Sequence, residues 1–450
     1  MISRAVAAGR RFTGGMSADT RAGLSGLTWS YMGHGIQLVF RFGSSLILTR
    51  LLAPDDYGLF AMALPVLFFL EFLSDIGLRP IVGRSPNGES PDFLGTAWTI
   101  VVARGAALSL AVVGLAFVLP SLYGKPAMGP VLLALAVRPF LWSFQNPTLF
   151  VLFRRLEYRQ PFLLDVTQTL VYIPVTILLA AALQNVWALV LGMLIGDLYR
   201  IVMTHVLCPR APRFAWHKPS VAEFSHFGVS IFLNTLAYGA WLYFDRLSGP
   251  RVLTAEEFAW YGLAWNLAEG LDNLIGRASE VFYSMLNRKA DDGERRAFYQ
   301  RSVRRLALFV IPVLAFGAVT APFVFPLLYT ADYAPAGMLL GLLIARLIFR
   351  AVGQLQFMYL MMRGEVIVST RAYVFAFGTV AGAFVVYGLV RGWDAFTPLY
   401  VALSAVGGMA AYVVGQTVQM LWRKEGSPWP LVIGLAWTAL AVAVVVFTSP

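Results

Sequence analysis

Polar and charged side chains recur on one face of a long apolar segment near the start of this chain. Ser30, His34, Gln37 and Arg41 follow one another at steps of 4, 3 and 4 residues, which places them on one side of an α-helix. An ionisable side chain in an apolar segment costs free energy unless it faces a partner or a water-filled cavity. The chemistry open to such a face is ion pairing, the binding of a charged or polar ligand, or the exchange of protons or Na⁺.

Comparable groups lie in later apolar segments. The 4, 3, 4 spacing returns at Asn234, Tyr238, Trp241 and Asp245. Candidate binding residues over the whole chain are Arg41, Arg277, Arg346, Arg350, Gln37, Asn234 and Asn266. Acids that could couple an ion, or hold these arginines in place, are Glu71, Glu269 and Asp272. Ionisable groups expected to pair between helices or to reach the surface are Arg104, Arg138, Asp165, Asp197 and Arg200.

The polar residues named above lie in apolar segments that are predicted to be membrane helices. Apolar residues make up 58% of the 450-residue chain and charged residues 13%, with a mean hydropathy of +0.68. Thirteen apolar segments are each long enough to cross about 30 Å of hydrocarbon. In lipid every backbone amide must be satisfied within its own segment, so helices are predicted. The fold class is therefore an all-α polytopic membrane protein.

The distribution of basic residues predicts the orientation. With a cytoplasmic N-terminus, 23 of the 35 Lys and Arg residues fall in or beside cytoplasmic connections, 4 fall outside and 8 lie within spans. That bias follows the positive-inside rule for a multi-pass membrane protein. The net charge of +11 is then explained by orientation next to anionic lipid, and a nucleic-acid partner is not expected.

The chain repeats itself at an offset of 201 residues. Arg50, Asp55 and Asp56 align with Arg251, Glu256 and Glu257, and these turns are expected to have a structural role. At the same offset Glu71 aligns with Asp272, while Arg138 aligns with Arg346 after a short insertion. We expect two six-helix lobes related as parallel repeats. The predicted parts are a basic cytoplasmic segment (1–23), an N-terminal lobe (24–207), a basic cytoplasmic linker (208–225), a C-terminal lobe (226–421) and one extra C-terminal transmembrane segment (429–447).

Enzymatic functions are disfavoured. The outside connections are short, whereas a membrane glycosyltransferase or polymerase would need a catalytic acid on a sizeable loop. No G-x-x-x-x-G-K-[ST] motif is present for nucleotide hydrolysis. Four scattered histidines and a single cysteine do not suggest a metal site. Neither a catalytic residue nor a cofactor is expected.

Several runs of residues resemble a known family. L-T-R-L-L-A-P-D-D-Y-G-L-F-A-M-A (48–63), F-L-S-D-I-G-L (72–78), Y-F-D-R-L (243–247) and Y-G-L-A-W-N-L-A-E-G (261–270) look like the polysaccharide transporter family. It is part of the superfamily of multidrug, oligosaccharidyl-lipid and polysaccharide exporters. The resemblance implies a flippase that carries polyprenyl-pyrophosphate-linked oligosaccharide across the inner membrane. It also implies that helices 1, 2, 7 and 8 line a central cavity.

The implied cargo gives the candidate residues their roles. Guanidinium groups bind phosphate bidentately, so Arg41 is the first choice for the diphosphate, followed by Arg277 and by an Arg346/Arg350 clamp. Membrane lipid, a polysaccharide polymerase and a chain-length regulator are the other implied partners. However, the four cavity helices hold three arginines against six acids, a net charge of −3 that fits a cationic cargo better. A cation-coupled multidrug exporter and a peptidoglycan-precursor flippase therefore remain open alternatives.

Overall fold

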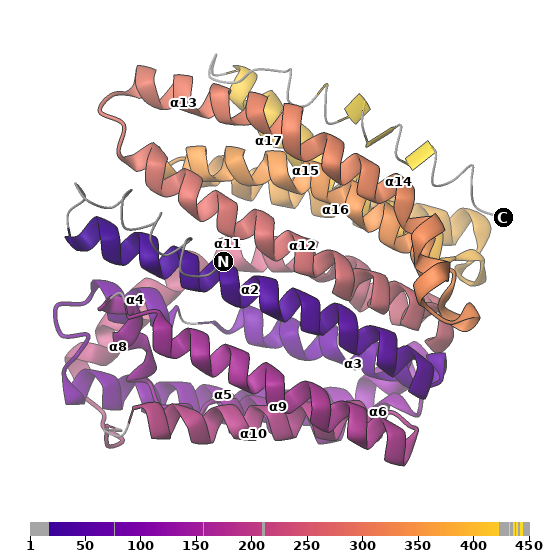
Figure 1. The fold of residues 1–450 in the computed structure, drawn as a ribbon, viewed down its shortest axis with the longest axis horizontal. Helices are drawn as coiled ribbons and strands as arrows, with labels where there is room; N and C mark the ends of the chain where they lie inside the picture. Colours follow the sequence, from indigo (N-terminus) through magenta and orange to yellow (C-terminus); the bar gives the residue numbers. More distant parts are fainter. Residues whose placement is uncertain are drawn as a thin grey trace, which may run out of the picture.

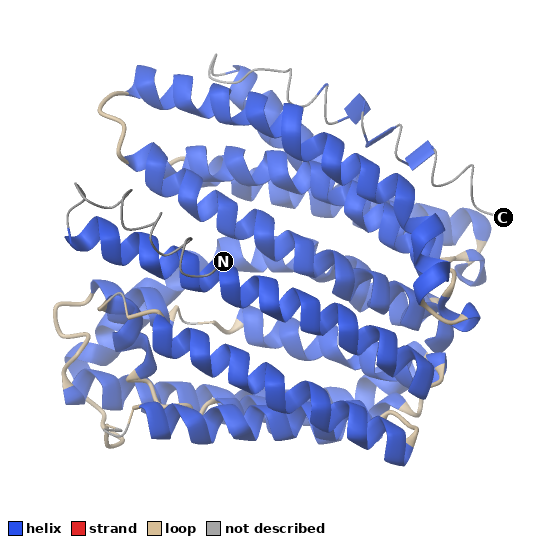
Figure 2. Cartoon of the chain, viewed as in Figure 1, coloured by secondary structure: helices blue, strands red, loops and turns tan. Residues whose placement is uncertain are grey.

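The computed structural model describes residues 18–75, 77–155, 157–208 and 212–422, with isolated residues between 432 and 443. Side chains are described from Gly33 onward within these ranges, except those of His34, Arg79 and residues 225–234. Over the described ranges the chain is helical, with turns and short connections between the helices (Figure 2). The predicted all-α class is confirmed. The predicted segment 429–447 and most of segment 1–23 lie outside the described residues.

The first half of the chain contains six helical segments, which correspond to the six predicted ones. They are α2 (Ala18–Leu51), α3 (Pro54–Leu73), α5 (Pro91–Tyr123), α6 and α7 (Met128–Leu135 and Val137–Trp142), α9 (Arg159–Leu183) and α10 (Trp187–Leu207). Two short helices, α4 (Leu78–Arg84) and α8 (Leu149–Arg154), lie in the connections predicted to be cytoplasmic.

The second half contains six further segments. They are α11 (Lys218–Val252), α12 (Ala255–Asn287), α13 (Asp292–Arg305) continuing through the π-helical turn η1 (Leu306–Val310) into α14 (Ile311–Leu328), α15 (Ala336–Met362), α16 (Val366–Arg391) and α17 (Pro398–Trp422). Short 3₁₀ turns, η2 (Ala331–Tyr333) and η3 (Trp393–Ala395), complete two connections.

Several predicted boundaries shift. Helix α2 begins at Ala18 and not at 24, and α11 begins at Lys218, so the linker before it is shorter than 208–225. Pro219 occupies the first turn of α11, where a missing backbone N–H is tolerated. The basic residues between 292 and 305 form the helix α13. In each case the helix continues through polar residues beyond its apolar stretch. Hydropathy detects the apolar stretch but not these polar helix ends.

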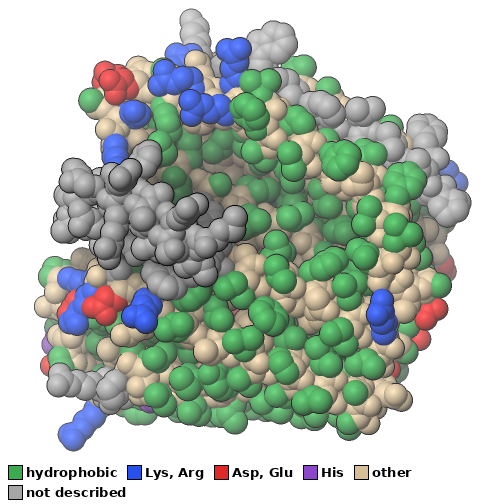
Figure 3. Space-filling model, viewed as in Figure 1, with side chains coloured by type: hydrophobic (Ala, Val, Ile, Leu, Met, Phe, Trp, Pro, Cys, Tyr) green, Lys and Arg blue, Asp and Glu red, His purple; other side chains and the backbone are tan. Residues whose placement is uncertain are grey.

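The two halves of the chain form the two sides of the helix bundle. Helices α2 to α10 lie in the lower part of Figure 1 and α13 to α17 in the upper part, with α2, α3, α11 and α12 meeting between them. Helix α12 packs against α3 and α2, and α11 packs against α3 and α5. Lys and Arg side chains gather at the left end of the face in Figure 3, while its centre is largely hydrophobic.

Among the helices that meet between the halves, α2, α11 and α12 are less apolar than most of the bundle. Within the described residues, eight helices, α3 among them, are long and apolar enough to cross a membrane. Helices α2, α11 and α12 have the length but are not among the eight, and α6 and α7 are shorter. Charged residues such as Arg41, Arg246 and Glu269 lie on these three more polar helices, which identifies the region between the halves as the place to look for a site.

The two halves are in close contact at the end of the bundle that the charge pattern predicts to be outside. The Ser45 and Tyr329 hydroxyls are 2.6 Å apart, and Tyr123 donates to the Leu247 carbonyl at 2.9 Å. A Cβ on Gly58 of α3 would lie 1.8 Å from the carbonyl oxygen of Ala255 at the start of α12. Only glycine permits so close an approach of these two helix ends, so this end of the bundle is closed.

The repeated turns before α3 and α12 have the structural role expected of them. Thr254 and Glu257 form a reciprocal capping box at the start of α12. In the first half, Asp56 instead accepts a hydrogen bond from the Val186 backbone at 3.1 Å. Both turns place acids in the first helical turn, where they are stabilised by the helix dipole.

Candidate substrate cavity

A cavity of about 430 Å³ lies between the two halves. The four helices expected to line it, α2, α3, α11 and α12, all contribute side chains. Helices α7, α9 and α10 of the first half also line it, through residues such as Arg138, Tyr172 and Asp197. The volume is within the usual range of small-molecule sites, and it suits a polar head group better than a whole oligosaccharide.

Arg41 lies in this cavity and crosses it. Its Nη1 donates to Glu269 Oε2 at 3.0 Å and to the Asn266 carbonyl oxygen at 3.1 Å, both on α12. Gln37, one turn earlier on α2, also lines the cavity. The structure therefore brings together four of the predicted residues, Gln37, Arg41, Asn266 and Glu269. The side-chain oxygen of Asn266 is buried and has no hydrogen-bond partner among the described residues.

Arg138 forms a buried ion-pair cluster at the cavity wall. Its Nη1 contacts both Glu71 oxygens, at 2.7 and 2.9 Å, and its Nε donates to Asp197 at 2.8 Å. The guanidinium also lies over the Phe68 and Trp142 rings. Glu71 is therefore held by an arginine, one of the two roles considered for it. The predicted inter-helix pairing of Arg138 and Asp197 is confirmed.

Arg246 is the cavity arginine that sequence reasoning missed. Its guanidinium carbon lies 4.1 Å from the Trp265 ring centre and 4.3 Å from that of Tyr243. It donates to the Leu242 carbonyl, and its buried Nε has no hydrogen-bond partner among the residues that the structure describes. Among the described residues, no carboxylate lies within ion-pair distance of Arg246, in contrast to Arg41 and Arg138. It thus brings an uncompensated positive charge to the cavity.

The expected polar face of α11 points elsewhere. Trp241 stacks on Tyr373 of α16 and lies against Tyr412 of α17, and Asp245 accepts a hydrogen bond from Tyr261. That face therefore packs inside the second half, and the cavity receives Arg246, one residue further along. The side chain of Asn234 is outside the described residues. Spacing identified a polar face correctly but could not say which neighbour it meets.

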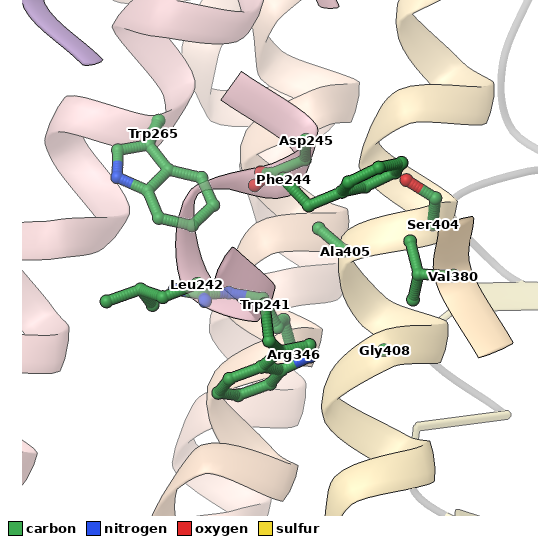
Figure 4. Close-up of a pocket in the computed structure, with 10 residues that line it drawn as sticks. All are labelled: Trp241, Leu242, Phe244, Asp245, Trp265, Arg346, Val380, Ser404, Ala405 and Gly408. Atoms are coloured by element: carbon green, nitrogen blue, oxygen red, sulfur yellow. The ribbon is translucent and has the colours of Figure 1, made fainter. Parts of the chain in front are cut away.

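Arg346 and Arg350 do not line the cavity. Both pair with Asp272, at 3.7 and 3.0 Å, and Arg346 is buried against the Trp265 ring. Arg346 instead lines a second space of about 20 Å³, close to the size needed by one water molecule (Figure 4). The two arginines do form a clamp, but on a carboxylate of their own chain. Trp265 lies beside both cavities.

The remaining charged candidates have local partners. Arg277 contacts Glu280 on its own helix at 3.3 Å and does not line the cavity. Arg200 pairs with Asp165 at 2.6 Å, as predicted for an inter-helix pair. Arg104 donates to the Ser74 carbonyl oxygen at 3.0 Å.

The net charge of the side chains that line the cavity differs from the net charge counted over all ionisable residues of the four predicted cavity helices. Its charged lining residues are three arginines (Arg41, Arg138 and Arg246) and two acids (Asp197 and Glu269), a net charge of +1. Including Glu71, the second partner of Arg138, brings the balance to zero. The predicted −3 does not describe the cavity, because Asp245 and Asp272 are bound elsewhere.

Comparison with known proteins identifies a family whose model matches this chain. Residues 47–338 match the model of a family described as polysaccharide biosynthesis protein. The chain belongs to this family. The resemblance found from the sequence motifs is thereby confirmed, and the match includes α3 to α14 and nearly the whole cavity lining.

Named relatives of this polysaccharide biosynthesis family member include two bacterial proteins. The succinoglycan biosynthesis transport protein ExoT of Rhizobium meliloti (strain 1021) is 23% identical over 319 residues, 70% of this chain. The match spans 64% of ExoT's own length. The lipopolysaccharide biosynthesis protein WzxC of Escherichia coli (strain K12) is 22% identical over 87% of this chain and 80% of its own.

Solved structures share the fold. The lipid II flippase MurJ in an inward closed conformation superposes with a TM-score of 0.70 and 12% identity, over 95% of this chain and 93% of its own. The eukaryotic MATE transporter AtDTX14 gives a TM-score of 0.59 at 13% identity, over 95% and 99%. This family member therefore has the fold shared by these transporters.

Proposed function

We propose that this protein is a flippase that moves polyprenyl-diphosphate-linked oligosaccharide across the bacterial inner membrane by alternating access. The transported saccharide would serve exopolysaccharide, capsule or lipopolysaccharide synthesis. In this proposal the N-terminus is cytoplasmic, and a polysaccharide polymerase and a chain-length regulator act on the product. The chain has a transport role and no catalytic one.

The observation that carries the proposal is Arg246 at the boundary between the halves. Its guanidinium is oriented by two aromatic rings and lies in a cavity with two further arginines, and no carboxylate in the described part of the chain pairs with it. A diphosphate that leaves water needs cations to replace its hydration, and guanidinium groups supply planar pairs of donors. Membership of the polysaccharide biosynthesis family supports the saccharide part of the cargo.

The lining charge also helps to rank the alternatives. A cavity that selects cationic drugs would be expected to present an excess of acids, whereas here three arginines are balanced by three acids even when Glu71 is included. A multidrug exporter is therefore the weaker candidate. A peptidoglycan-precursor flippase would use the same diphosphate chemistry, so the saccharide must be identified by experiment.

The test is deletion of the gene, followed by analysis of lipid-linked saccharides in each leaflet. We expect loss of the surface polysaccharide and accumulation of its lipid-linked repeat unit on the cytoplasmic side. Arg41→Ala should fail to restore the polymer although the protein remains in the membrane, while the exposed Arg155→Ala should restore it. Unchanged polysaccharide with new sensitivity to cationic drugs would overturn the proposal, and accumulation of peptidoglycan precursor would identify the other cargo.

A further inference from the structure

One ion pair joins the two halves of the molecule. Arg41 of α2 and Glu269 of α12 lie 228 residues apart in sequence, with Nη1 and Oε2 separated by 3.0 Å. Ten other ion pairs between described residues each join side chains of the same half. This pair is thus placed to resist separation of the halves at the cavity.

The pair is far more accessible than the neighbouring clusters. The side chains of Arg41 and Glu269 are 36% and 46% exposed, whereas those of Arg138 and Asp197 are 9% and 5% exposed. An accessible ion pair contributes little stability, because water competes for both charges. Arg41 and Glu269 can therefore be separated by a competing anion, whereas the buried clusters cannot be separated without a large desolvation penalty.

Arg41 also has donors left for a ligand. A single nitrogen, Nη1, makes both of its contacts to α12, and its Nε and Nη2 donate to no described residue. These two nitrogens form the edge of the guanidinium that binds phosphate oxygens in parallel. A bidentate phosphate contact is stronger than the single contact that Glu269 now makes.

We propose that the Arg41–Glu269 pair is a lock between the halves, which the diphosphate of the cargo opens by replacing Glu269 at the guanidinium. Glu269 occupies the place of the cargo anion while the cavity has no cargo. Once phosphate oxygens bind Arg41, the carboxylate is released and repelled, so the attraction between α2 and α12 is lost. Binding of cargo is thereby coupled to movement of the halves. This inference rests on the proposed function.

The test uses the full-length protein in lipid nanodiscs with a sugar-free polyprenyl diphosphate as the probe. Spin labels are attached to Ser121→Cys and Asp394→Cys, exposed positions in opposite halves, in a Cys208→Ser background. Pulsed EPR reports the distance between the halves, and titration reports the affinity for the probe. Glu269→Gln removes the lock, and Glu280→Gln is the matched control, because it alters an ion pair within α12 outside the cavity.

We expect the probe to change the distance in the wild type. Glu269→Gln should raise the population with the changed distance without the probe, and bind the probe more tightly, each by about two- to fivefold, the factor expected for an accessible ion pair. Glu280→Gln should behave as the wild type. High salt should shift the wild-type distance without the probe but leave Glu269→Gln unchanged, which tests the lock even where the variant folds poorly.

Two outcomes overturn the inference in different ways. A wild type that binds the probe, with Glu269→Gln unchanged in distance and affinity, would overturn the lock and leave the proposed function standing. A wild type that fails to bind any polyprenyl diphosphate would overturn the proposed function, and the lock with it.

Discussion

At the scale of single residues, the cavity arginines differ in what they hold. Arg138 has two carboxylate partners, Arg41 has one, and Arg246 has aromatic rings in place of a carboxylate. An arginine that is paired with buried carboxylates is neutralised and stabilises the fold. An arginine that is held by cation–π contacts has no carboxylate to neutralise it, so its positive charge is available to a ligand. In the proposed function the three residues therefore form a series, from a structural role for Arg138 to a binding role for Arg246.

The first prediction concerns Arg246. Arg246→Ala should weaken binding of a polyprenyl diphosphate by about 1.5–3 kcal/mol, about ten- to a hundredfold, because a charge-assisted hydrogen bond is lost. Arg246→Lys should recover part of the affinity, since it retains the charge but not the planar donor pair. Titration of the purified protein measures both, with Arg155→Ala as control. Equal affinity in wild type and Arg246→Ala would exclude this residue from the site.

The second prediction concerns Arg138. Arg138→Gln should destabilise the protein by about 3–5 kcal/mol, since it leaves Asp197 buried without its cation. Thermal unfolding in detergent measures the loss, and the double variant Arg138→Gln/Asp197→Asn should recover part of it. If the single variant unfolded at the wild-type temperature, the cluster would not be a structural one.

The sequence allowed part of this site to be predicted. Helical spacing brought Gln37 and Arg41 to one face, and the 201-residue offset linked Glu71 with Asp272. Each of these acids holds an arginine that the repeat also aligned, Arg138 in one half and Arg346 in the other. That correspondence is consistent with two related lobes, which remain a prediction. Arg246 was missed because which face of α11 meets the cavity is decided by the stacking of Trp241 on Tyr373, a contact between distant residues.

At the scale of helices, the closed end depends on how near α3 comes to α12. Gly58→Leu should force these helix ends apart, because even a Cβ would overlap the Ala255 carbonyl. The expected cost is about 1–3 kcal/mol, as for other overpacked sites. A thiol at the buried position 45 (Ser45→Cys) should then react faster with a membrane-impermeant maleimide. Gly114→Leu is the control, since Gly114 has open space around it; equal reactivity in both variants would refute the close-approach argument.

The connection between α4 and α5 should respond to pH. Arg155, near the end of α8, donates to the Glu89 carboxylate at 2.5 Å and lowers the pKa of that carboxyl below its ordinary value. The contact therefore stabilises the fold above the unfolded pKa of about 4.3 and is lost as the pH falls through the lower folded pKa. The hydrogen-exchange protection factors of residues 85–90, which remove the pH dependence of intrinsic exchange, should fall over that acidic range in the wild type. In Glu89→Gln the protection factors of the same segment should be low at every pH, and an unchanged profile would contradict the assignment.

At the scale of the whole molecule, the structure is closed at the predicted outer end and has its cavity between the halves. Further contacts between the halves at that end join the end of α2 to the turn after α14, where Thr330 donates to the Thr49 carbonyl at 3.4 Å and Tyr333 to the Leu52 carbonyl at 3.3 Å. These are single, mostly neutral hydrogen bonds, each of small net value. Such an interface holds one state without preventing another, as alternating access requires.

A covalent link across this interface should therefore stop transport. Thr49→Cys and Thr330→Cys, joined through two disulfides by a short bis-methanethiosulfonate reagent in a Cys208→Ser background, would fix the outer end in its closed state. We expect proteoliposomes with this link to move no lipid-linked saccharide, and reduction to restore the activity. The matched control joins Tyr387→Cys and Ala395→Cys, which lie within the second half where Tyr387 donates to the Ala395 carbonyl at 3.1 Å. Because that link joins two positions within one half, it leaves the halves free to separate. Transport should therefore continue at the rate of the protein without a link. Transport that persisted with residues 49 and 330 joined would mean that the halves do not separate at this end, and that the cargo leaves by another route.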